Sequence, residues 1–510
     1  MSGPEELATF SVRAACIRGV EAQPVTVEVS LTGGIPGMSI VGMADAAVLE
    51  ARGRIRCALR SSGFEVPRKN IVVNLAPGDI RKTGAGFDLP IALAILVVSR
   101  QIPAAGIDGF LFAGELALSG QVQAVRGEVA YGLLARELGL TLVTGWSGGH
   151  IPLHGVEQGY VSSLGELRLG VADAVKPFAC VDSSRVQVPV ALDYSDVVGQ
   201  EIAKRGMAIA AAGGLGMLMV GPPGAGKTML AKRMTGILPP IGEREQQEAL
   251  CIHSVMGEDL SGLLAGRRPF RSPHHSISCA GLVGGGRPVH PGEISLAHGG
   301  VFFLDELAEF SASVLQTLRQ PLEAGEVRIV RVDGAYVFPS RFQLLAASNP
   351  CPCGYLGDRD IACTCAPAAI ERYQAKLAGP LADRIDIAID VARPDPELIV
   401  EGAEGMDSGA LLEMVERGRS FARRRGTRAG RDCLGGVPSA ESVAERFGLD
   451  GGARRSLLDI ARRNHMTGRG MVRLARVART IGDMDESEQV RSEHLLEASM
   501  YQGRRLHADV

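Results

Sequence analysis

The chain has 510 residues, of which 46% are hydrophobic and 22% are charged, and its formal net charge is −3. These values suit a globular protein of roughly two to four domains. They exclude a strongly basic, histone-like protein, so any contact with nucleic acid must come from local patches. The N-terminus lacks an apolar signal-peptide core, and the longest apolar run, residues 89–98, is too short to span a bilayer. We therefore expect a cytoplasmic protein without membrane contact, whose ten cysteines are reduced.

Residues 1–180 alternate short β-rich runs with apolar helical patterns, which predicts a domain of mixed strands and helices. The β-rich runs occupy 25–33 and 70–78, and the helical patterns occupy 45–63 and 89–101. Residues 181–196 lack a clear helical period. They are expected to form a linker with some extended structure.

The segment GMLMVGPPGAGKTMLAKRM, at 216–234, carries the most specific signal of the chain. Its G-x-x-x-x-G-K-T pattern lies between an apolar strand and a helix, the context of a phosphate-binding loop. Lys227 can reach the β- and γ-phosphates of a nucleotide, and the Thr228 hydroxyl can bind Mg²⁺. The residues expected to bind nucleotide are Gly221, Pro222, Pro223, Gly224, Ala225, Gly226, Lys227, Thr228, Met229 and Asp305.

A second apolar run, VFFL at 301–304, ends in two carboxylates. Asp305 is expected to hold Mg²⁺ together with Thr228, and Glu306 to orient or deprotonate an attacking water. The apolar run at 341–348 ends in Asn349, which would lie beside the γ-phosphate if its strand lay between the other two. These residues predict an ATP-hydrolysing α/β core.

Two segments of this core are candidates for contact with a polyanion. A Gly- and Pro-rich segment at 267–300 is predicted to be a loop insertion within a helix, and residues 325–342 predict a β-hairpin with its turn at Asp333–Gly334. Adjacent histidines rarely share a metal ion, so His274 and His275 are better explained by hydrogen bonding or phosphate contact than by a metal. The candidate contacts are Arg267, Arg268, Arg271, His274, His275, Arg328 and Arg331.

Four of the ten cysteines, Cys351, Cys353, Cys363 and Cys365, form two C-x-C pairs. Two such pairs can close around one tetrahedral Zn²⁺. The C-x-C spacing is tighter than the commoner C-x₂-C, so metal-free reduced thiols and a redox or disulfide role remain alternatives.

From residue 395 onward the sequence is helical and Arg-rich, without strong strand signals. Its segment 417–431 holds seven arginines and no acid. This pattern indicates either a solvated helix face or a surface that contacts DNA or the rest of a helical lid.

The phosphate loop, the Asp305–Glu306 pair and Asn349 together resemble the AAA+ ATPases, with Asn349 at the sensor 1 position and VGQE, at 198–201, at the start of the module. The insertion and the hairpin resemble the magnesium chelatase and replicative-helicase branch of that class. The motifs RPFRSPHHS, GGGRPVHPGEISLAHGGVFFLDE, NPCPCGY and GPLADRID are similar to the ComM/YifB family of magnesium chelatase-like proteins. The N-terminal NLAPGDIRKTGAGFDLPIA fits the same family, so the resemblance covers essentially the whole chain.

The resemblance implies a ring of identical subunits, a hexamer, that uses ATP and Mg²⁺ for DNA branch migration during natural transformation. Branched or single-stranded DNA would then be contacted by loops that face the pore of a ring-shaped helicase. The resemblance also implies that Arg384 is an arginine finger acting on the ATP of the neighbouring subunit, and that Arg469 is sensor 2 in the lid. The implied catalytic set is Glu306, Lys227, Asn349, Arg384 and Arg469.

The N-terminal region resembles the ribosomal S5-type fold shared with the proteolytic domain of Lon. Lon-type proteolysis needs a Ser nucleophile and a Lys. Here the nucleophile position holds Phe87 or Asp88, and the segment 114–139 contains no lysine, so we expect a non-proteolytic domain.

The expected fold is therefore an α/β AAA+ P-loop core with an N-terminal S5/Lon-like α+β domain and a C-terminal helical lid. The expected limits are 1–180 for the N-terminal domain, 181–196 for the linker, 197–394 for the core and 395–510 for the lid. Alternatives to a DNA motor are a magnesium-chelatase motor subunit, a Lon-like protease and an ATP-dependent protein-remodelling factor. Because a chelatase motor would not need the N-terminal domain, its presence favours DNA.

Overall fold

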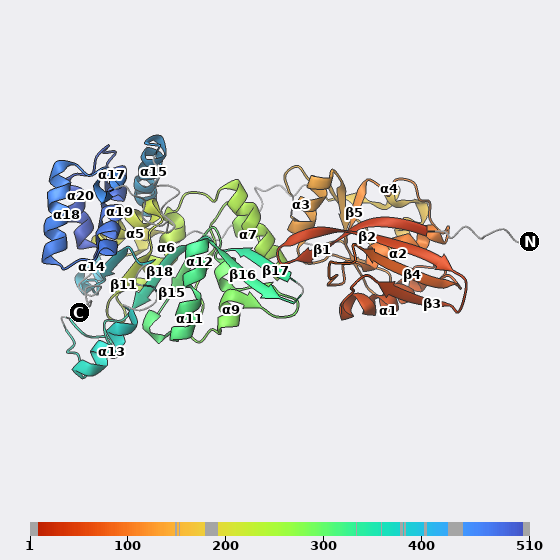
Figure 1. The fold of residues 1–510 in the computed structure, drawn as a ribbon, viewed down its shortest axis with the longest axis horizontal. Helices are drawn as coiled ribbons and strands as arrows, with labels where there is room; N and C mark the ends of the chain where they lie inside the picture. Colours follow the sequence, from red (N-terminus) through yellow and green to blue (C-terminus); the bar gives the residue numbers. More distant parts are fainter. Residues whose placement is uncertain are drawn as a thin grey trace, which may run out of the picture.

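The computed structural model describes residues 9–147, 150–151, 153–178, 192–332, 334–358, 360–377, 381, 384–401, 405–426 and 442–502. The molecule is elongated, with one β-sheet at the N-terminal end, a second sheet in the middle and a group of helices at the other end (Figure 1). Within the described ranges, no helix combines the length and the apolar character needed to cross a membrane.

The N-terminal sheet is mixed and has the strand order β10-β9-β8-β5-β1-β2-β4-β3. Its long central strands pair antiparallel, β1 with β2 and β2 with β4, and in β2 and β4 buried side chains alternate with partly buried ones. The strands are β1 (Thr9–Arg18), β2 (Glu21–Thr32), β3 (Gly37–Val41), β4 (Asn70–Ala76), β5 (Phe110–Phe112), β8 (Thr141–Thr144), β9 (Gln158–Tyr160) and β10 (Lys176–Pro177).

Helix α2 (Asp88–Val98) lies in the core of this domain, and every one of its residues is buried. This is why its sequence is apolar all round instead of amphipathic, as the run at 89–98 predicted. The other elements of the domain are α1 (Ala46–Ser61), β6 (Glu115–Leu116), β7 (Val122–Gln123), α3 (Glu128–Leu138), η1 (Leu164–Leu169) and α4 (Val171–Ala174).

The middle sheet is parallel, with the order β12-β15-β18-β11-β19. Strand β18 lies between β11 and β15, which is the arrangement that Asn349 needs in order to lie beside the phosphate loop. The strands are β11 (Met217–Val220), β12 (Phe270–Arg271), β15 (Val301–Leu304), β18 (Gln343–Ser348) and β19 (Ile387–Asp390). All four residues of β11 and of β15 are buried, as expected for a sheet covered on both faces. Helices α5 (Glu201–Gly213) and α6 (Lys227–Ile237) flank this sheet.

The segment predicted as a loop insertion is partly core structure. Phe270 and Arg271 form β12, which pairs parallel with β15 at the edge of the sheet. The surrounding elements are α7 (Glu243–Met256), α8 (Ser261–Leu264), α9 (Cys279–Val283), β13 (Gly284–Gly285), β14 (His290–Pro291) and α10 (Glu293–Leu296). After β15 come η4 (Leu307–Glu309), α11 (Ala312–Thr317) and α12 (Arg319–Ala324). The predicted hairpin is present as β16 (Glu326–Arg331) and β17 (Gly334–Pro339), and Asp333 of its turn lies outside the described residues.

The hairpin and α7 pack against the N-terminal domain, and the hairpin tip reaches the end of β1 in Figure 1. Val20 and Val129 of the N-terminal domain share one buried apolar cluster with Ile252 of α7. The Gly127 amide donates to the Ser254 carbonyl at 3.2 Å across the same junction. The two parts therefore meet through a continuous core.

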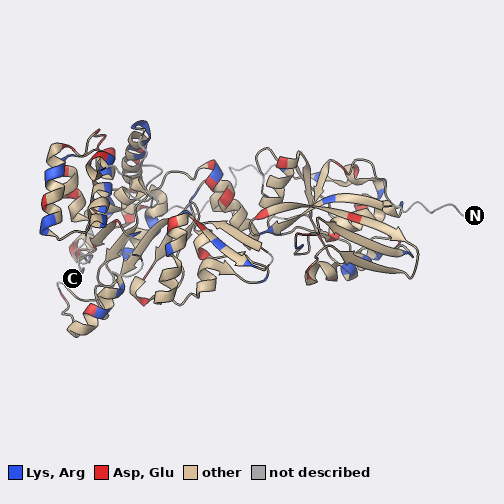
Figure 2. Ribbon diagram, viewed as in Figure 1, with Lys and Arg blue, Asp and Glu red and all other residues tan. Residues whose placement is uncertain are grey.

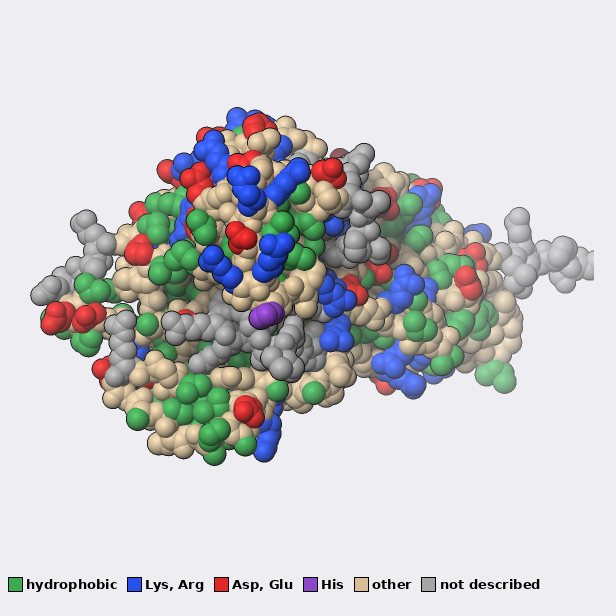
Figure 3. Space-filling view, turned by 60° about the vertical axis from the view of Figure 1, so that its left-hand side comes forward, with side chains coloured by type: hydrophobic (Ala, Val, Ile, Leu, Met, Phe, Trp, Pro, Cys, Tyr) green, Lys and Arg blue, Asp and Glu red, His purple; other side chains and the backbone are tan. Residues whose placement is uncertain are grey.

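The described residues after 395 form helices, as predicted. They are α14 (Pro396–Glu401), α15 (Ser408–Arg424), α17 (Val443–Phe447), α18 (Gly451–Arg463), α19 (Gly468–Met484) and α20 (Ser492–Met500), and α13 (Pro367–Leu377) precedes them. Lys and Arg side chains are spread over the helical lobe that comes forward in Figure 3. Within the Arg-rich segment, Arg419 of α15 donates to the Ala211 carbonyl of α5 at 2.6 Å, and Arg425 pairs with Asp483 of α19 at 2.9 Å, so the first joins α15 to the core and the second joins it to another C-terminal helix. Residues 427–431 of that segment and the linker residues 181–191 lie outside the described residues.

Candidate nucleotide site and cysteine cluster

The phosphate loop runs from Gly221 to Gly226, between the carboxyl end of β11 and the start of α6. A Cβ atom at Gly221 would lie 2.1 Å from the Val391 carbonyl oxygen, so only glycine fits there. Gly226 has a φ of +85°, in the left-handed region that glycine adopts without strain. Met229 is an exposed residue of the first turn of α6. The backbone amides at this helix start can bind anions.

Lys227 is folded over the loop and meets the end of β18. Its Nζ donates to the carbonyl oxygens of Gly221 at 2.6 Å and Pro222 at 3.0 Å, and to Asn349 Oδ1 at 3.2 Å. Burial lowers the pKa of Lys227 from its ordinary value, and the charges of Asp305 and Glu306 oppose this shift. Residues 122 positions apart in the sequence thus meet beside the phosphate loop.

Thr228 and the end of β15 form the second half of the cluster. Thr228 Oγ1 donates to Asp305 Oδ2 at 2.8 Å, so a hydroxyl and a carboxylate, both ligand types that Mg²⁺ accepts, are adjacent. Glu306 follows with a φ of +53°, an unusual backbone state for a non-glycine residue. Its carboxylate lies 3.5 Å from His275 Nδ1 and is half exposed, so it is accessible to solvent.

Two further polar side chains reach the phosphate loop. Gln200, part of the VGQE segment, donates to the Ala225 carbonyl at 3.5 Å, and Arg393, which the sequence did not single out, donates through Nε to the Pro223 carbonyl at 3.2 Å. Arg393 comes shortly after the end of β19, as Asp305 comes directly after β15. Because the carboxyl ends of parallel strands meet at one edge of the sheet, this position in the sequence could have predicted that Arg393 lies near the phosphate loop.

Arg384 lies at the amino edge of the parallel sheet, opposite the carboxyl edge that carries the phosphate loop. Its carbonyl adjoins Gly216, immediately before β11, and its guanidinium pairs with Glu323. Strands β11 and β19 pair from Met217–Ile387 to Val220–Asp390. Because strands rise about 3.3 Å per residue, this register separates Arg384 from the phosphate loop of its own chain by roughly 13 Å or more.

Arg469 is an exposed residue in the first turn of α19. Further along the same helix, Arg473 donates to the Ile385 carbonyl at 3.2 Å and Arg476 pairs with Asp386 at 3.0 Å. These contacts hold α19 against the amino edge of β19, the edge that carries Arg384. The structure therefore brings together Lys227, Thr228, Asp305, Glu306 and Asn349, and it places Arg384 at the other end of the strands within one chain.

Two arginines expected to contact a polyanion are structural. Arg268 is largely buried and donates to the Pro239 carbonyl at 2.7 Å. Arg271 forms a two-point contact with Glu293, at 2.7 Å for both bonds, and also meets Glu258 at 2.8 Å. Paired arginines of this kind fix the edge strand β12 and are not available to phosphate.

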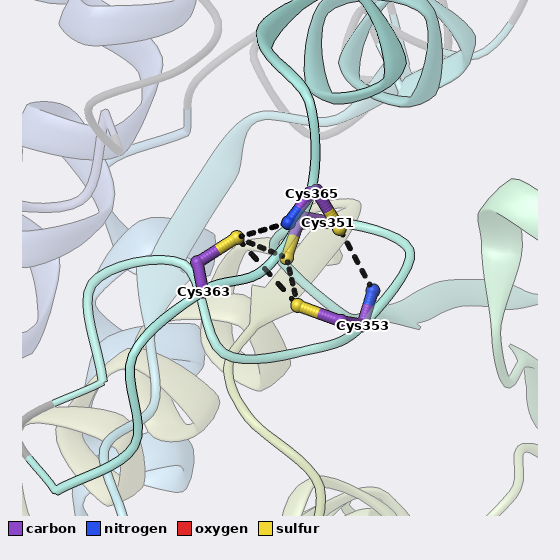
Figure 4. Close-up of side chains that lie close together, drawn as sticks. All are labelled: Cys351, Cys353, Cys363 and Cys365. Atoms are coloured by element: carbon purple, nitrogen blue, oxygen red, sulfur yellow. Dashed lines mark hydrogen bonds between the residues drawn. The ribbon is translucent and has the colours of Figure 1, made fainter.

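The four cysteines converge in the loop that follows β18 (Figure 4). Their sulfur atoms all lie within 4.8 Å of one another, with pairs at 3.4, 3.5 and 3.6 Å, and none forms a disulfide. Zinc–sulfur bonds of about 2.3 Å in a tetrahedron place sulfur atoms about 3.8 Å apart, so the cluster fits a zinc ion. The backbone amides of Tyr355 and Thr364 lower the pKa of Cys353 to about 6, whereas in Cys363 and Cys365 a backbone amide lowers the pKa but burial and the neighbouring thiols raise it overall.

The cysteine loop also touches the phosphate loop. A Cβ atom at Gly354 would lie 2.7 Å from Pro223 Cδ, so the loop packs against the P-loop with no room for a side chain. The Gln374 side chain of α13 donates to the Pro350 carbonyl at 3.3 Å on the other side. The cluster therefore fixes a loop that supports the nucleotide site.

The parallel sheet and the residues at its carboxyl edge define an AAA+ ATPase. Family models agree with this class along the chain. The model described as Magnesium chelatase, subunit ChlI, matches residues 193–398. Subunit ChlI of Mg-chelatase matches 27–144, and Magnesium chelatase, subunit ChlI C-terminal, matches 405–502.

Curated relatives cover almost the full length. YifB of Salmonella typhimurium is 37% identical over 97% of both chains, and YifB of Escherichia coli is 38% identical over 95% of both. The competence protein ComM of Haemophilus influenzae is 38% identical, also over 95% of both chains. The chain belongs to the magnesium chelatase ChlI family, in the branch that includes YifB and ComM.

Proposed function

We propose that this AAA+ ATPase is a ring motor that acts on DNA, as a branch-migration helicase in recombination during natural transformation. The observation that carries the proposal is the 38% identity to a protein named for competence, over 95% of both chains. The nucleotide cluster supplies the chemistry, and the proposed form is a hexamer. The domain limits given above and the S5/Lon-like character of the N-terminal part belong to the same proposal.

In the proposed reaction ATP binds with its phosphates at the loop 221–226. Lys227 and Asn349 hold the γ-phosphate, and Glu306 accepts a proton from the attacking water. Thr228 and Asp305 would hold Mg²⁺, which neutralises charge on the phosphate oxygens. The adjacency of these side chains supports the assignment.

Arg384 is proposed to act on ATP bound by the neighbouring subunit, and Arg469 to act as sensor 2 in the lid. Arg384 lies at the amino edge of the sheet, away from the phosphate loop of its own chain. In a head-to-tail ring the amino edge of one subunit can face the nucleotide of the next. A guanidinium there would neutralise charge that develops on the γ-phosphate.

A Lon-like protease is the weaker alternative. Phe87 is buried, and Asp88 is buried in a two-point pair with Arg54, so neither residue is an exposed nucleophile. Burial raises the pKa of the nearby Cys16 to about 11, which keeps that thiol protonated. These observations support a non-proteolytic N-terminal domain.

We further propose that Cys351, Cys353, Cys363 and Cys365 bind one structural zinc ion. Purified protein should contain about one zinc per chain, measured by atomic emission after removal of loosely bound metal. Cys363→Ser should lose most of it and lower ATP turnover, because the cysteine loop supports the phosphate loop at Pro223. The matched control is Cys57→Ser, an exposed cysteine outside the cluster. Equal zinc content in both variants would contradict the assignment.

The proposed motor is tested by its steady-state ATPase rate with different effectors. Four-way or forked DNA should raise the rate several-fold, while a porphyrin or casein should not change it. Strand exchange in a labelled four-way junction should require ATP. Stimulation by a porphyrin with a partner protein would favour the chelatase alternative, and stimulation by an unfolded protein alone would favour remodelling.

A further inference from the structure

A large cleft lies between the N-terminal domain and the motor core. Its volume is about 1510 Å³, larger than the roughly 300–1,000 Å³ of typical small-molecule pockets, so it suits an extended ligand. One wall comes from the N-terminal domain, with Arg18, Arg81 and Arg126. The other comes from the segment before β14 and from the hairpin, with Arg287 and Arg331.

The cleft is basic, and its charge is available. Among the described residues, five arginines line it, against the two carboxylates of Asp45 and Glu115. The Asp45 carboxylate is already used, because it caps α1 by accepting from the Val48 amide at 2.9 Å. In the parts of the chain described here, Arg81, Arg126, Arg287 and Arg331 form no ion pair, and all four are exposed. Arg268 and Arg271, in contrast, form ion pairs with neighbouring glutamates.

A further polar group in the lining also lacks a partner. The buried Nδ1 of His290 has no hydrogen-bond partner among the described residues. The walls are fixed, because the guanidinium of Arg18 lies 5.5 Å from the centre of the Tyr336 ring of the hairpin and the junction shares a buried core. Basic residues appear on both the hairpin and the facing end of β1 in Figure 2. Arg81, Arg126, Arg287 and Arg331 therefore line one cleft, and none of these four forms an ion pair with a described carboxylate.

Apolar side chains also line the cleft, beside the arginines of the hairpin. Val330 and Val332 of the hairpin line the cleft and are 71% and 108% exposed. Proteins hold single strands without reading sequence by combining basic side chains for the phosphates with aromatic rings on which bases stack, and the Tyr336 ring of the hairpin also lines this cleft. A duplex would offer only phosphates to such a surface.

We propose that this cleft binds the backbone of a single DNA strand, so that the N-terminal domain forms one wall of the DNA path. The proposal rests on the DNA-motor function above and assigns the N-terminal domain a direct role in it. Arg81 and Arg126 are the contacts that this domain supplies, and Arg287 and Arg331 face them from the core.

The test is binding of fluorescent oligothymidine, followed by anisotropy over a range of salt concentrations. Arg81→Ala/Arg126→Ala should weaken binding at least tenfold at low salt. The slope of log affinity against log salt should fall by about 1.4, since each phosphate contact on a single strand contributes about 0.7. Arg81→Lys/Arg126→Lys should keep the wild-type slope, because the charges remain.

The matched control is Arg13→Ala/Arg56→Ala, two exposed arginines of the same domain outside the cleft, which should bind as wild type. ATP turnover without DNA should be unchanged in all variants, which shows that the motor is folded. If wild type binds the strand and the Arg81/Arg126 variant matches it in affinity and slope, the cleft is not the site, although the motor could still act on DNA. An equal loss in the control pair would also overturn the proposal. If wild type binds no DNA, the function itself is wrong.

Discussion

Replacing Glu306 by glutamine should reduce ATP turnover by about 10²- to 10⁴-fold, the range that loss of a general base produces. The substitution keeps the shape of the side chain and removes only its ability to accept a proton. Lys227, Thr228 and Asp305 remain in place, so the variant should still bind ATP. Steady-state phosphate release, together with equilibrium binding of labelled ATP, measures both effects.

Glu309→Gln is the matched control, because Glu309 is also exposed and lies on the short helix directly after Glu306. It should turn over ATP at close to the wild-type rate. Full turnover by Glu306→Gln would remove Glu306 from the proposed reaction. Loss of ATP binding in that variant would show a structural role instead.

Arg384→Ala should lower ATP turnover by about 10³-fold or more, because arginine fingers contribute 10³ to 10⁵ in related phosphoryl transfers. Mixing two inactive variants tests whether Arg384 acts on the ATP of a neighbouring subunit. Lys227→Ala should also be inactive, but mixing the two inactive variants should restore activity, since about one interface in four would pair an intact Lys227 with an intact Arg384 from the next subunit. ATPase assays over a series of mixing ratios measure this recovery.

The double variant Lys227→Ala/Arg384→Ala is the control for mixing, and combining it with either single variant should restore nothing. Glu323→Gln separates the finger role from the ion pair of Arg384, and we expect it to leave turnover largely intact. If the mixtures stay inactive at every ratio, Arg384 does not act across a subunit interface.

Much of the nucleotide site was predictable because each of its parts follows a strand. A short buried run ending in a polar residue marks the carboxyl edge of a parallel sheet, and such ends meet in space. Lys227, Asp305 and Asn349 are far apart in sequence, yet this rule placed them together. The convergence of the four cysteines was predictable from their spacing, because a short loop joins the two C-x-C pairs and keeps them close in space.

The roles of individual arginines were not predictable. Arg268 and Arg271 look like free basic residues in a Gly- and Pro-rich run, and the sequence does not show that Glu245, Glu258 and Glu293 fold back onto them. Strand β12 has only two residues, too few for a periodic pattern. The basic cleft draws on segments far apart in the chain, so no local pattern could reveal it.

The N-terminal domain was expected to separate a DNA motor from a chelatase motor, but the family model that matches residues 27–144 also carries the chelatase name. The preference for DNA now rests on the full-length likeness to ComM. Functional assays must therefore separate the two.

Sedimentation of the Glu306→Gln protein with ATP and a labelled four-way junction reports ring assembly and DNA binding in one measurement. We expect ATP to assemble the 53.7 kDa chain into a ring, a hexamer, and the label to sediment with it. A protein that stays a single chain in ATP, with the junction sedimenting as free DNA, would contradict this expectation.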